Sequence, residues 1–310
     1  MKKVFIDGSA GTTGLRISER LENRKDIKLI KLTEENRKDI HARKEAINKA
    51  DIAFLCLPDA AAIEAVSLID NPNTAVLDTS TAHRTNDDWA YGFPELSNSH
   101  YEKVKNSKRI AVPGCHASGF ISLIYPLVEK GVLKTDAMLS CVSLTGYSGG
   151  GKKMIAQYED SEKDCLLDAP RQYGLTQNHK HLPEMIKITG IKNAPAFMPI
   201  VGDFYSGMEV TVPIFSQMLK AGTTIETIKG IYRKKYNGPL VNFKESFDED
   251  GFVSANGQEG KDSMEISVVG NEDRILLISR YDNLGKGASG AAVECMNILL
   301  GCDITTGLEK

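Results

Sequence analysis

The N-terminal segment places the strongest constraint on the fold. The apolar run Val4–Ile6 leads directly into glycines at Gly8, Gly11 and Gly14, and a helical pattern begins at Thr13. A strand, a glycine-rich turn and a helix in this order are typical of the first unit of a doubly wound parallel sheet. Glycine is needed there because the backbone turns tightly and approaches a pyrophosphate at the helix N-terminus.

The residues of this turn are therefore candidate dinucleotide ligands. Its glycines would let the backbone approach a phosphate, and its hydroxyl side chains would add donors. The alternative is a plain structural turn. We predict that a dinucleotide contacts Gly8, Ser9, Gly11, Thr12, Thr13 and Gly14.

The pattern of strands and helices continues as far as residue 112. Apolar runs predict strands at 4–7, 27–32, 52–57, 74–78 and 109–112. Helical spacing predicts helices at 13–21, 37–49 and 60–69. Strands that alternate with helices indicate a parallel sheet covered on both faces.

The pattern changes after residue 115. Strand-like runs lie at 139–144, 196–201, 208–215, 265–269 and 275–281, separated by long connections and a helix at 225–235. This spacing favours a mixed or antiparallel sheet. The stretch 287–300 again has helical periodicity. The predicted fold class is α/β, a Rossmann-type parallel-sheet domain followed by an α+β domain with a mixed sheet.

Composition excludes several classes of protein. The chain has 310 residues, 41% hydrophobic and 25% charged, with a net charge of -3. That charge gives no positive field that would attract nucleic acid. No apolar run is long enough to span a membrane. The first apolar run is interrupted by Asp7 and is too short for a signal peptide. We therefore expect a cytoplasmic protein. Its six cysteines form no C-x-x-C pair, and a chain of this length does not need disulfide bonds.

The second strand predicts which dinucleotide binds. An NAD site usually has Asp or Glu at the end of this strand, to bond the ribose 2′-hydroxyl. Here the strand runs into Thr33, with Arg37 close behind. A guanidinium suits a 2′-phosphate better, so we predict NADP(H), with Arg37 as a ligand. The alternative is that Arg37 is a solvated charge at the start of a helix.

Cys115 differs from the other cysteines in its local context. Pro113-Gly114 turns the chain after a strand, and a helical pattern follows. A helix N-terminus carries unpaired N–H groups and the positive end of the macrodipole, which favour a thiolate and a developing oxyanion. Together with the glycine loop, this thiol predicts covalent thioester chemistry coupled to hydride transfer.

The helix alone does not activate this thiol. A free thiol has a pKa near 8.5, and lowering it by about 1.5 units takes about 2 kcal/mol. A helix N-terminus supplies about 0.3–1 kcal/mol. We therefore expect a histidine partner, with an imidazolium as the remaining source of stabilisation. His116 is excluded as the base because adjacent helical residues do not face each other.

His179 is the preferred base. It stands with His181 in a polar loop that ends in Pro183-Glu184. Glu184 would orient a ring nitrogen, as the third member of a nucleophile–base–orienter set. A histidine pair is also a possible metal site, but no third ligand has suitable spacing, so we predict no metal.

Two further segments are candidate anion sites. Asp78–Arg84 begins where a strand ends, the usual ligand-binding edge of an α/β sheet, and it contains Ser80 and Arg84. The segment Tyr147–Lys152 is a glycine-rich cationic turn that contains Ser148. We predict Ser80 as a cofactor ligand. We predict Arg84, Ser148, Lys152 and His181 as substrate ligands, and the alternative for the triglycine is a plain loop.

These motifs, taken in order, resemble one enzyme family. Gly8-x-x-Gly11-x-x-Gly14, Pro113-Gly114-Cys115, Gly146–Lys152, His179–Glu184 and Asp282–Gly290 look like N-acetyl-gamma-glutamyl-phosphate reductase in its shorter form. The resemblance extends from Val4 to about Leu300. The chain departs from the family pattern at Val112, where Asn is more common, and at His116-Ala117-Ser118, where Tyr-Pro-Thr is more common.

The resemblance implies a domain organisation and a reaction. It implies a Rossmann domain at 1–114, completed by the C-terminal helix at 287–310, and an α+β domain at 115–286 that also mediates subunit contacts. It implies NADPH-dependent reduction of an acyl phosphate in arginine biosynthesis, with Cys115 as nucleophile and His179 as acid–base partner near Glu184. It also places Asn283 and Gly285 at the nicotinamide end, and a homo-oligomer, dimer or tetramer, is expected.

Two other functions fit the same residues. An aspartate-semialdehyde-type dehydrogenase shares the loop, the thiol and the histidine, so the chemistry of the site alone does not separate the two substrates. A non-catalytic NADP-binding regulator would need the glycine loop but no activated thiol.

Overall fold

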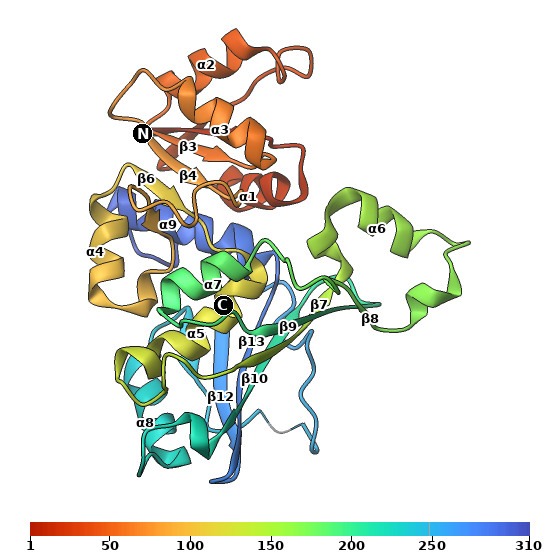
Figure 1. Cartoon of the computed structure of the whole chain (residues 1–310). Helices are drawn as coiled ribbons and strands as arrows, with labels where there is room; N and C mark the ends of the chain where they lie inside the picture. Colours follow the sequence, from red (N-terminus) through yellow and green to blue (C-terminus); the bar gives the residue numbers. More distant parts are fainter. Residues whose placement is uncertain (248) are drawn as a thin grey trace. The chain divides into compact units, whose positions relative to one another are not determined.

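The chain divides into two units at Cys115. The computed structural model describes residues 1–247 and 249–310. The N-terminal unit contains residues 1–114 and 288–308, and the C-terminal unit contains residues 115–287 and 309–310 (Figure 1). The helix near the C-terminus therefore belongs to the N-terminal unit.

The N-terminal unit is built on a parallel sheet of six strands. The strand order is β2-β1-β3-β4-β6-β5, and every pairing in it is parallel. The strands are β1 (Lys2–Asp7), β2 (Ile27–Ile30), β3 (Ile52–Leu55), β4 (Ala75–Asp78), β5 (Ala90–Tyr91) and β6 (Arg109–Ala111). The helices are α1 (Thr12–Glu22), α2 (Ile40–Lys49), α3 (Asp59–Ser67), α4 (Asn98–Asn106) and α9 (Gly290–Leu300), with a short 3₁₀ turn at Pro94–Leu96.

Helices cover both faces of this sheet. Successive side chains of a strand point to opposite faces, so alternate residues enter different cores. Val4 and Ile6 pack in the core that contains α1, α4 and α9, whereas Phe5 packs in the core that contains α2 and α3. A strand buried on both faces is continuously apolar, which explains the short apolar runs of the sequence.

The glycine loop between β1 and α1 is shaped by close backbone contacts. Gly8 has φ +83°, and a Cβ there would lie 2.2 Å from the carbonyl oxygen of Cys56. A Cβ on Gly14 would lie 2.4 Å from the carbonyl oxygen of Gly8. Side chains at these two positions would therefore push the loop away from the sheet.

The C-terminal unit is built on a mixed sheet of seven strands. Their order is β11-β12-β13-β10-β7-β9-β8. The pairs β11–β12 and β7–β9 are parallel and the others antiparallel. The strands are β7 (Ser140–Gly146), β8 (Arg171–Gln172), β9 (Ala196–Gly202), β10 (Met208–Phe215), β11 (Val241–Phe243), β12 (Met264–Gly270) and β13 (Arg274–Tyr281).

Helix α5 (Cys115–Glu129) lies at the centre of this unit. It packs on β10 and β13 and contacts α7 (Leu182–Thr189) and α8 (Ile225–Lys235). Most of its side chains are buried. Helix α6 (Gly151–Glu159) follows the 3₁₀ turn Tyr147–Gly150, and further 3₁₀ turns lie at Cys165–Asp168 and Ser216–Met218.

The predicted fold class is confirmed, and the differences lie at element ends and in several short elements. The helix that we predicted at 37–49 begins at Ile40 instead. The Asp39 carboxylate accepts the N–H of Ala42 at 2.7 Å and caps the helix at that point. The helix predicted from 287 is preceded by a π-helical turn, Gly285–Ser289. The short elements β5, β8, β11, α4, α6 and α7 were not predicted.

Within residues 1–247 and 249–310, no helix is both long and apolar enough to span a membrane.

Two glycine variants test the packing of the loop. We expect Gly14→Ala to lower the free energy of unfolding by about 1–3 kcal/mol, because its methyl group meets backbone atoms that a side-chain rotation does not relieve. Gly230→Ala in α8 is the control, since nothing lies within 4 Å of its Cβ position. It should gain about 0.5–1 kcal/mol from reduced chain entropy. Urea unfolding followed by circular dichroism measures both, and equal stability of the two variants would contradict this account.

Candidate active site

Cys115 is the first residue of α5 and is partly exposed. Strand β6 ends at Ala111, and a short turn leads into the helix. Other thiols are less suited to nucleophilic attack: burial raises the pKa of Cys56 to about 12, and burial also raises the pKa of Cys141, which is fully buried. Cys115 thus combines access with a helix N-terminus, as a reactive cysteine requires.

The π-helical turn approaches this thiol closely. An ideal Cβ on Gly287 would lie 3.1 Å from the Cβ of Cys115 and 3.4 Å from the ring of Tyr281. A side chain at Gly287 would therefore displace the nucleophile. π-Helical turns are frequent at functional sites.

A cluster of aromatic rings lies beside the start of α5. The ring of His116 is 5.8 Å from that of His179, 5.5 Å from that of His181 and 6.0 Å from that of Tyr173. The cluster also contacts Phe197 of β9. Rings from α5, β9 and the connection between β8 and α7 thus meet at one place.

His116 connects this cluster to the sheet. Its Nδ1 is hydrogen-bonded to the Ser143 hydroxyl and its Nε2 to the Tyr173 hydroxyl, both at 2.6 Å. Burial is the main reason that its pKa falls to about 3, and electrostatic interactions with His179 and Lys180 act in the same direction. His116 is therefore neutral at physiological pH and engaged at both nitrogens, which agrees with its exclusion as a base.

Tyr173 lies near the nucleophile. Burial raises its pKa, and the negative charge of the Cys115 thiolate raises it further. The phenol therefore stays protonated beside the thiol. Because Tyr173 also contacts His179, with ring centres 5.9 Å apart, the predicted nucleophile and the predicted base border the same cluster.

The structure corrects one expectation about His179. We expected a standing imidazolium, but burial and the neighbouring Lys180 both lower the pKa of His179, which favours a neutral ring. Its Nδ1 accepts the backbone N–H of His181 at 3.3 Å. At this distance the bond is weak and restrains the ring only loosely. A neutral imidazole of this kind is a base rather than a fixed cation.

His181 and Glu184 lie at the start of α7. His181 is the N-cap residue and is 4% exposed, and Glu184 is in the first turn and is 1% exposed. A carboxylate in the first turn of a helix interacts favourably with the macrodipole. The His181 ring contacts that of His179, with ring centres 4.8 Å apart, and Glu184 is buried on the same first turn of α7.

Asp282, which we did not predict, organises the segment after β13. One carboxylate oxygen accepts the N–H groups of Leu284 and Gly285 at 2.6 and 2.9 Å. The other accepts the Ser206 hydroxyl at 2.8 Å and the Gly260 N–H at 2.6 Å. Four hydrogen bonds to one buried carboxylate fix the turn that approaches Cys115.

Two predicted ligands from different segments meet here. The Asn283 amide donates to the Ser148 hydroxyl at 3.0 Å and accepts the Gly207 N–H at 2.9 Å. Both residues are 1% exposed. Gly285 is held equally closely, since a Cβ there would lie 1.9 Å from the carbonyl oxygen of Lys261. Lys152, in contrast, is exposed at the start of α6.

The glycine loop of the N-terminal unit fits a dinucleotide. Gly8 and Gly14 allow the loop to pack tightly against neighbouring backbone, and Thr12 and Thr13 are the first residues of α1. Ser9 is exposed at the tip of the loop. Gly11 is the N-cap residue, and no side chain caps the helix, so its first N–H groups suit a phosphate.

The other predicted ligands of this unit are engaged with the protein. Arg37 forms an exposed ion pair with Glu34 at 3.0 Å, which a bound 2′-phosphate would easily replace, because such pairs contribute little. The Ser80 hydroxyl donates to Asp78 at 2.7 Å. The Asp78 carboxylate also bonds His83 at 2.6 Å.

Arg84 does not lie as predicted. It is 8% exposed, and its Nε and Nη2 donate to the backbone carbonyls of Val112 and Thr79 at 2.9 and 2.8 Å. This guanidinium supports the loop that leads to Cys115, so we do not retain it as a substrate ligand.

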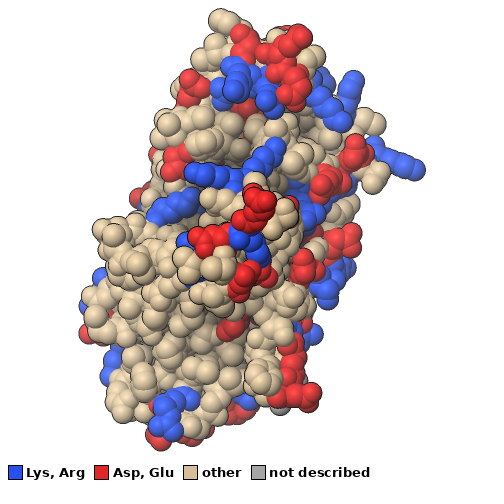
Figure 2. Space-filling model, turned by 90° about the vertical axis from the view of Figure 1, so that its right-hand side faces the viewer, with Lys and Arg blue, Asp and Glu red and all other residues tan. Residues whose placement is uncertain are grey.

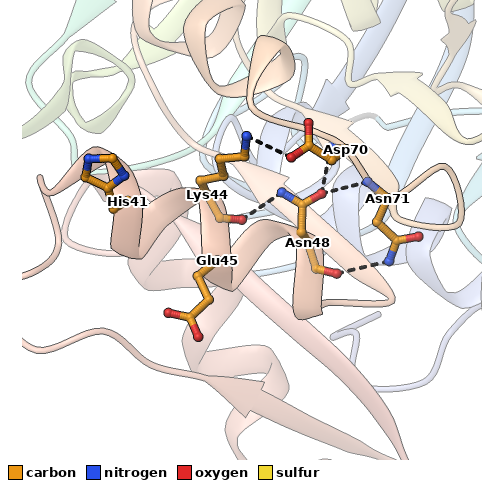
Figure 3. Close-up of a pocket in the computed structure, with 6 residues that line it drawn as sticks. All are labelled: His41, Lys44, Glu45, Asn48, Asp70 and Asn71. Carbon is orange, nitrogen blue, oxygen red and sulfur yellow. Dashed lines mark hydrogen bonds and ion pairs between the residues drawn. The ribbon is translucent and has the colours of Figure 1, made fainter.

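Two surface hollows are lined by none of the predicted site residues. One, of about 470 Å³, is lined mostly by apolar residues at the ends of β7 and β9 and by Leu182, together with Ser140 and Gln177. The other, of about 500 Å³, is lined by residues of α2 and the segment after α3 (Figure 3). There Lys44 pairs with Asp70, and Asn48 bonds the backbone N–H groups of Asp70 and Asn71, so these side chains join two elements.

Within the described residues no group of His, Cys, Asp and Glu is arranged to hold a metal ion.

Comparison with known proteins assigns the family. A sequence model described as semialdehyde dehydrogenase, NAD binding domain, matches residues 3–104, and one described as semialdehyde dehydrogenase, dimerisation domain, matches residues 115–283. N-acetyl-gamma-glutamyl-phosphate reductase 2 of a Nostoc species is 41% identical over 99% of both chains. The reductase of Rhizobium meliloti is 42% identical over 96% of this chain and 98% of that one.

This chain belongs to the N-acetyl-gamma-glutamyl-phosphate reductase family. The resemblance inferred from the motifs is therefore confirmed. The fold extends beyond the reductase family: aspartate semialdehyde dehydrogenase II of Vibrio cholerae, complexed with ASA, superposes with a TM-score of 0.73 at 16% identity over 97% of this chain and 98% of that one. The Candida albicans enzyme, solved with NADP, has a TM-score of 0.71 at 17% identity over 98% and 99%.

The sequence analysis missed Tyr173, Tyr281, Ser143 and Asp282. No motif marks the two tyrosines or the serine, since each lies in an ordinary polar or strand-like stretch. Asp282 was quoted in a motif, but its role depends on Ser206 and Gly260, which are distant in sequence.

The buried His116 predicts a pH dependence of stability. Unfolded His116 takes up a proton below about pH 6.5, whereas the folded residue resists protonation down to about pH 3. The unfolded state therefore binds more protons between these values, and the free energy of unfolding falls as the pH is lowered, by up to about 1.36 kcal/mol per pH unit. We expect His116→Gln to lose this part of the slope.

Urea unfolding at pH 7, 6 and 5 measures the effect. His41→Gln, at an exposed position of α2, is the control and should keep the wild-type slope. Identical slopes for the wild type and His116→Gln would contradict the assignment.

Proposed function

We propose that this protein reduces N-acetyl-L-glutamyl 5-phosphate to N-acetyl-L-glutamate 5-semialdehyde and phosphate, the third step of arginine biosynthesis, with NADPH. The observation that carries the proposal is an accessible thiol at the N-terminus of α5, beside a cluster that contains a neutral histidine. Relatives with this reductase name are 41–43% identical over nearly the whole chain.

The thiol performs the first step. The Cys115 thiolate attacks the acyl carbon of the substrate, a C–S bond forms, and the C–O bond to phosphate breaks. First-turn N–H groups of α5 stabilise the charge on the carbonyl oxygen. His179 takes the thiol proton as a neutral base, and buried Glu184 holds the imidazole in place. Lys152 and His181 are proposed to bind the anionic groups of the substrate, beside the turn that contains Ser148.

NADPH supplies the hydride that reduces the resulting thioester. The glycine loop Gly8–Gly14 is proposed to hold its pyrophosphate, and Arg37 its 2′-phosphate. Asn283 and Gly285 are proposed to form the wall at the nicotinamide end. The hydrogen bonds of Asn283 and Asp282 make this wall rigid, which positions reactants without an ordering cost at each turnover. When the thiohemiacetal collapses, the C–S bond breaks and the Cys115 thiolate is regenerated.

The substrate assignment is favoured over the alternatives. Aspartate semialdehyde dehydrogenases share the fold at only 13–17% identity, whereas the reductases share over 40%. A non-catalytic regulator has no use for a partly exposed thiol at a helix N-terminus beside a histidine cluster.

A cysteine variant tests the function. We expect Cys115→Ala to abolish reduction of N-acetylglutamyl phosphate while NADPH still binds, because the covalent step loses its nucleophile and the glycine loop is unchanged. Cys165→Ala, at an exposed position outside the cluster, is the control and should retain activity. Substantial turnover by Cys115→Ala would overturn the covalent route. Preference of the wild type for aspartyl phosphate would overturn the substrate.

We further propose that the protein forms a homo-oligomer through the outer face of the seven-stranded sheet. One face of β7 and β9 packs inward through Cys141, Ser143 and Phe197, whereas Val142 and Leu144 point outward and are only partly buried. Met198 lies opposite Val142 and Ile200 opposite Leu144.

The proposed interface continues across the sheet. The outward residues Thr211 and Pro213 of β10 and Leu276 of β13 extend the same surface. Figure 2 shows a broad area of the C-terminal unit with few charged side chains. Contiguous apolar area of this kind marks an interface, and the matching family model is described as a dimerisation domain.

A charge placed on this face tests the oligomer. We expect Val142→Glu to lower the molar mass measured by light scattering, because a carboxylate would be buried without a partner. Leu166→Glu, at an apolar side chain that is 65% exposed outside the face, is the control. An unchanged mass for Val142→Glu would place the interface elsewhere.

A further inference from the structure

The side chain of Tyr281 bonds two backbone groups in the first turn of α5. In an α-helix each N–H donates to the carbonyl four residues earlier, which pairs Gly119 with Cys115. Here the Tyr281 hydroxyl accepts the Gly119 N–H at 3.0 Å and donates to the Cys115 carbonyl at 2.6 Å. The phenol is therefore bonded to both members of this pair. A side chain inserted in this way changes the local shape of a helix.

Gly119 leaves space in α5 for the Tyr281 hydroxyl. Tyr281 is 0% exposed at the end of β13. An ideal Cβ on Gly119 would lie 2.6 Å from the Tyr281 hydroxyl oxygen and 2.8 Å from the Ser279 hydroxyl oxygen. Only glycine at this position of α5 leaves room for the phenol.

Tyr281 and Gly287 together enclose the nucleophile. Gly287 approaches the Cβ of Cys115 and the Tyr281 ring, as described above. The end of β13 and the π-helical turn that follows therefore contact Cys115 through both its carbonyl and its side chain.

We propose that Tyr281 is a positioning residue for the Cys115 thiol. By holding the Cys115 carbonyl it fixes the peptide plane between Cys115 and His116, and with it the backbone from which the thiol side chain projects. Donation to a carbonyl also polarises its peptide unit, which strengthens the His116 N–H as a donor. That N–H is one of the first-turn groups that stabilise a thiolate or an oxyanion. The inference rests on the proposed role of Cys115.

Other tyrosines bond the same helix without this role. The hydroxyl of Tyr236 donates to the Ser122 carbonyl at 2.8 Å, and Tyr232 donates to the Leu123 carbonyl. Both are buried and both bind the middle of α5. Tyr236 thus provides a matched control: the same group, the same helix and the same kind of bond, one turn or more away from the thiol.

The comparison of Tyr281→Phe with Tyr236→Phe tests the proposal. Each change deletes one buried hydroxyl and keeps the ring. We expect Tyr281→Phe to lower kcat about 10- to 100-fold, the range expected when a reacting group is misplaced, with little change in KM. The rate of Cys115 alkylation by iodoacetamide, followed by mass spectrometry, rises with pH as the thiol ionises. We expect the midpoint of this rise to lie at a higher pH in Tyr281→Phe. Tyr236→Phe should match the wild type in both readouts.

The pH readout reports the thiol. Burial raises the pKa of Tyr173 and of Tyr281, so both phenols stay protonated through the range of the experiment. The pKa of His116 falls to about 3, so that ring stays neutral in the same range, and burial also lowers the pKa of His179. Each rate is divided by the concentration of NADPH-binding sites. This counts only folded enzyme, so a partly unfolded variant can still be compared with the wild type.

Each outcome decides the question. A Tyr281→Phe enzyme with wild-type kcat and midpoint would overturn the proposal and leave Tyr281 as a structural contact. Equal losses in Tyr281→Phe and Tyr236→Phe would also overturn it, since the effect would then be on the helix as a whole. Activity in Cys115→Ala would overturn the proposed function itself, which separates the two failures.

Discussion

The end of β13 is the constraint on which the candidate site depends. Tyr281 bonds the first turn of α5, Asp282 accepts four hydrogen bonds, and Asn283 joins two other segments. These groups are buried, so each hydrogen bond forms in a medium of low dielectric constant and leaving one unmade is costly. The segment therefore has one well-defined conformation, and Cys115 takes its position from it.

Burial also determines the charge state of the cluster. Three histidines lie close together, yet burial and the nearby lysine favour neutral rings for His116 and His179. A neutral ring such as His116 fixes its neighbours through hydrogen bonds, and a neutral His179 is ready to accept a proton. Desolvation thus makes His116 a structural residue, whereas the acid–base role of His179 stays a prediction.

The sequence predicted those features that depend on local chain geometry. The parallel strands, the glycine loop and the cysteine at a helix N-terminus follow from short-range patterns, and the structure contains all three. Arg84 shows where this reasoning fails: its charge indicated an anion site, but burial directs it to the carbonyls of Val112 and Thr79. His116 shows the same limit of reasoning from the sequence. Helix geometry excluded it as a base but did not reveal Ser143 and Tyr173 as its partners.

By itself the sequence determined that a strand, a glycine turn and a helix begin the chain, and that one thiol starts a helix. These follow from backbone sterics and the period of apolar residues, which act over a few residues. Tertiary structure alone decided that Tyr281 reaches α5 from a strand 162 residues further along, and that Asp282 meets Ser206 and Gly260. Such contacts depend on strand register and on burial, and no short stretch of sequence contains either.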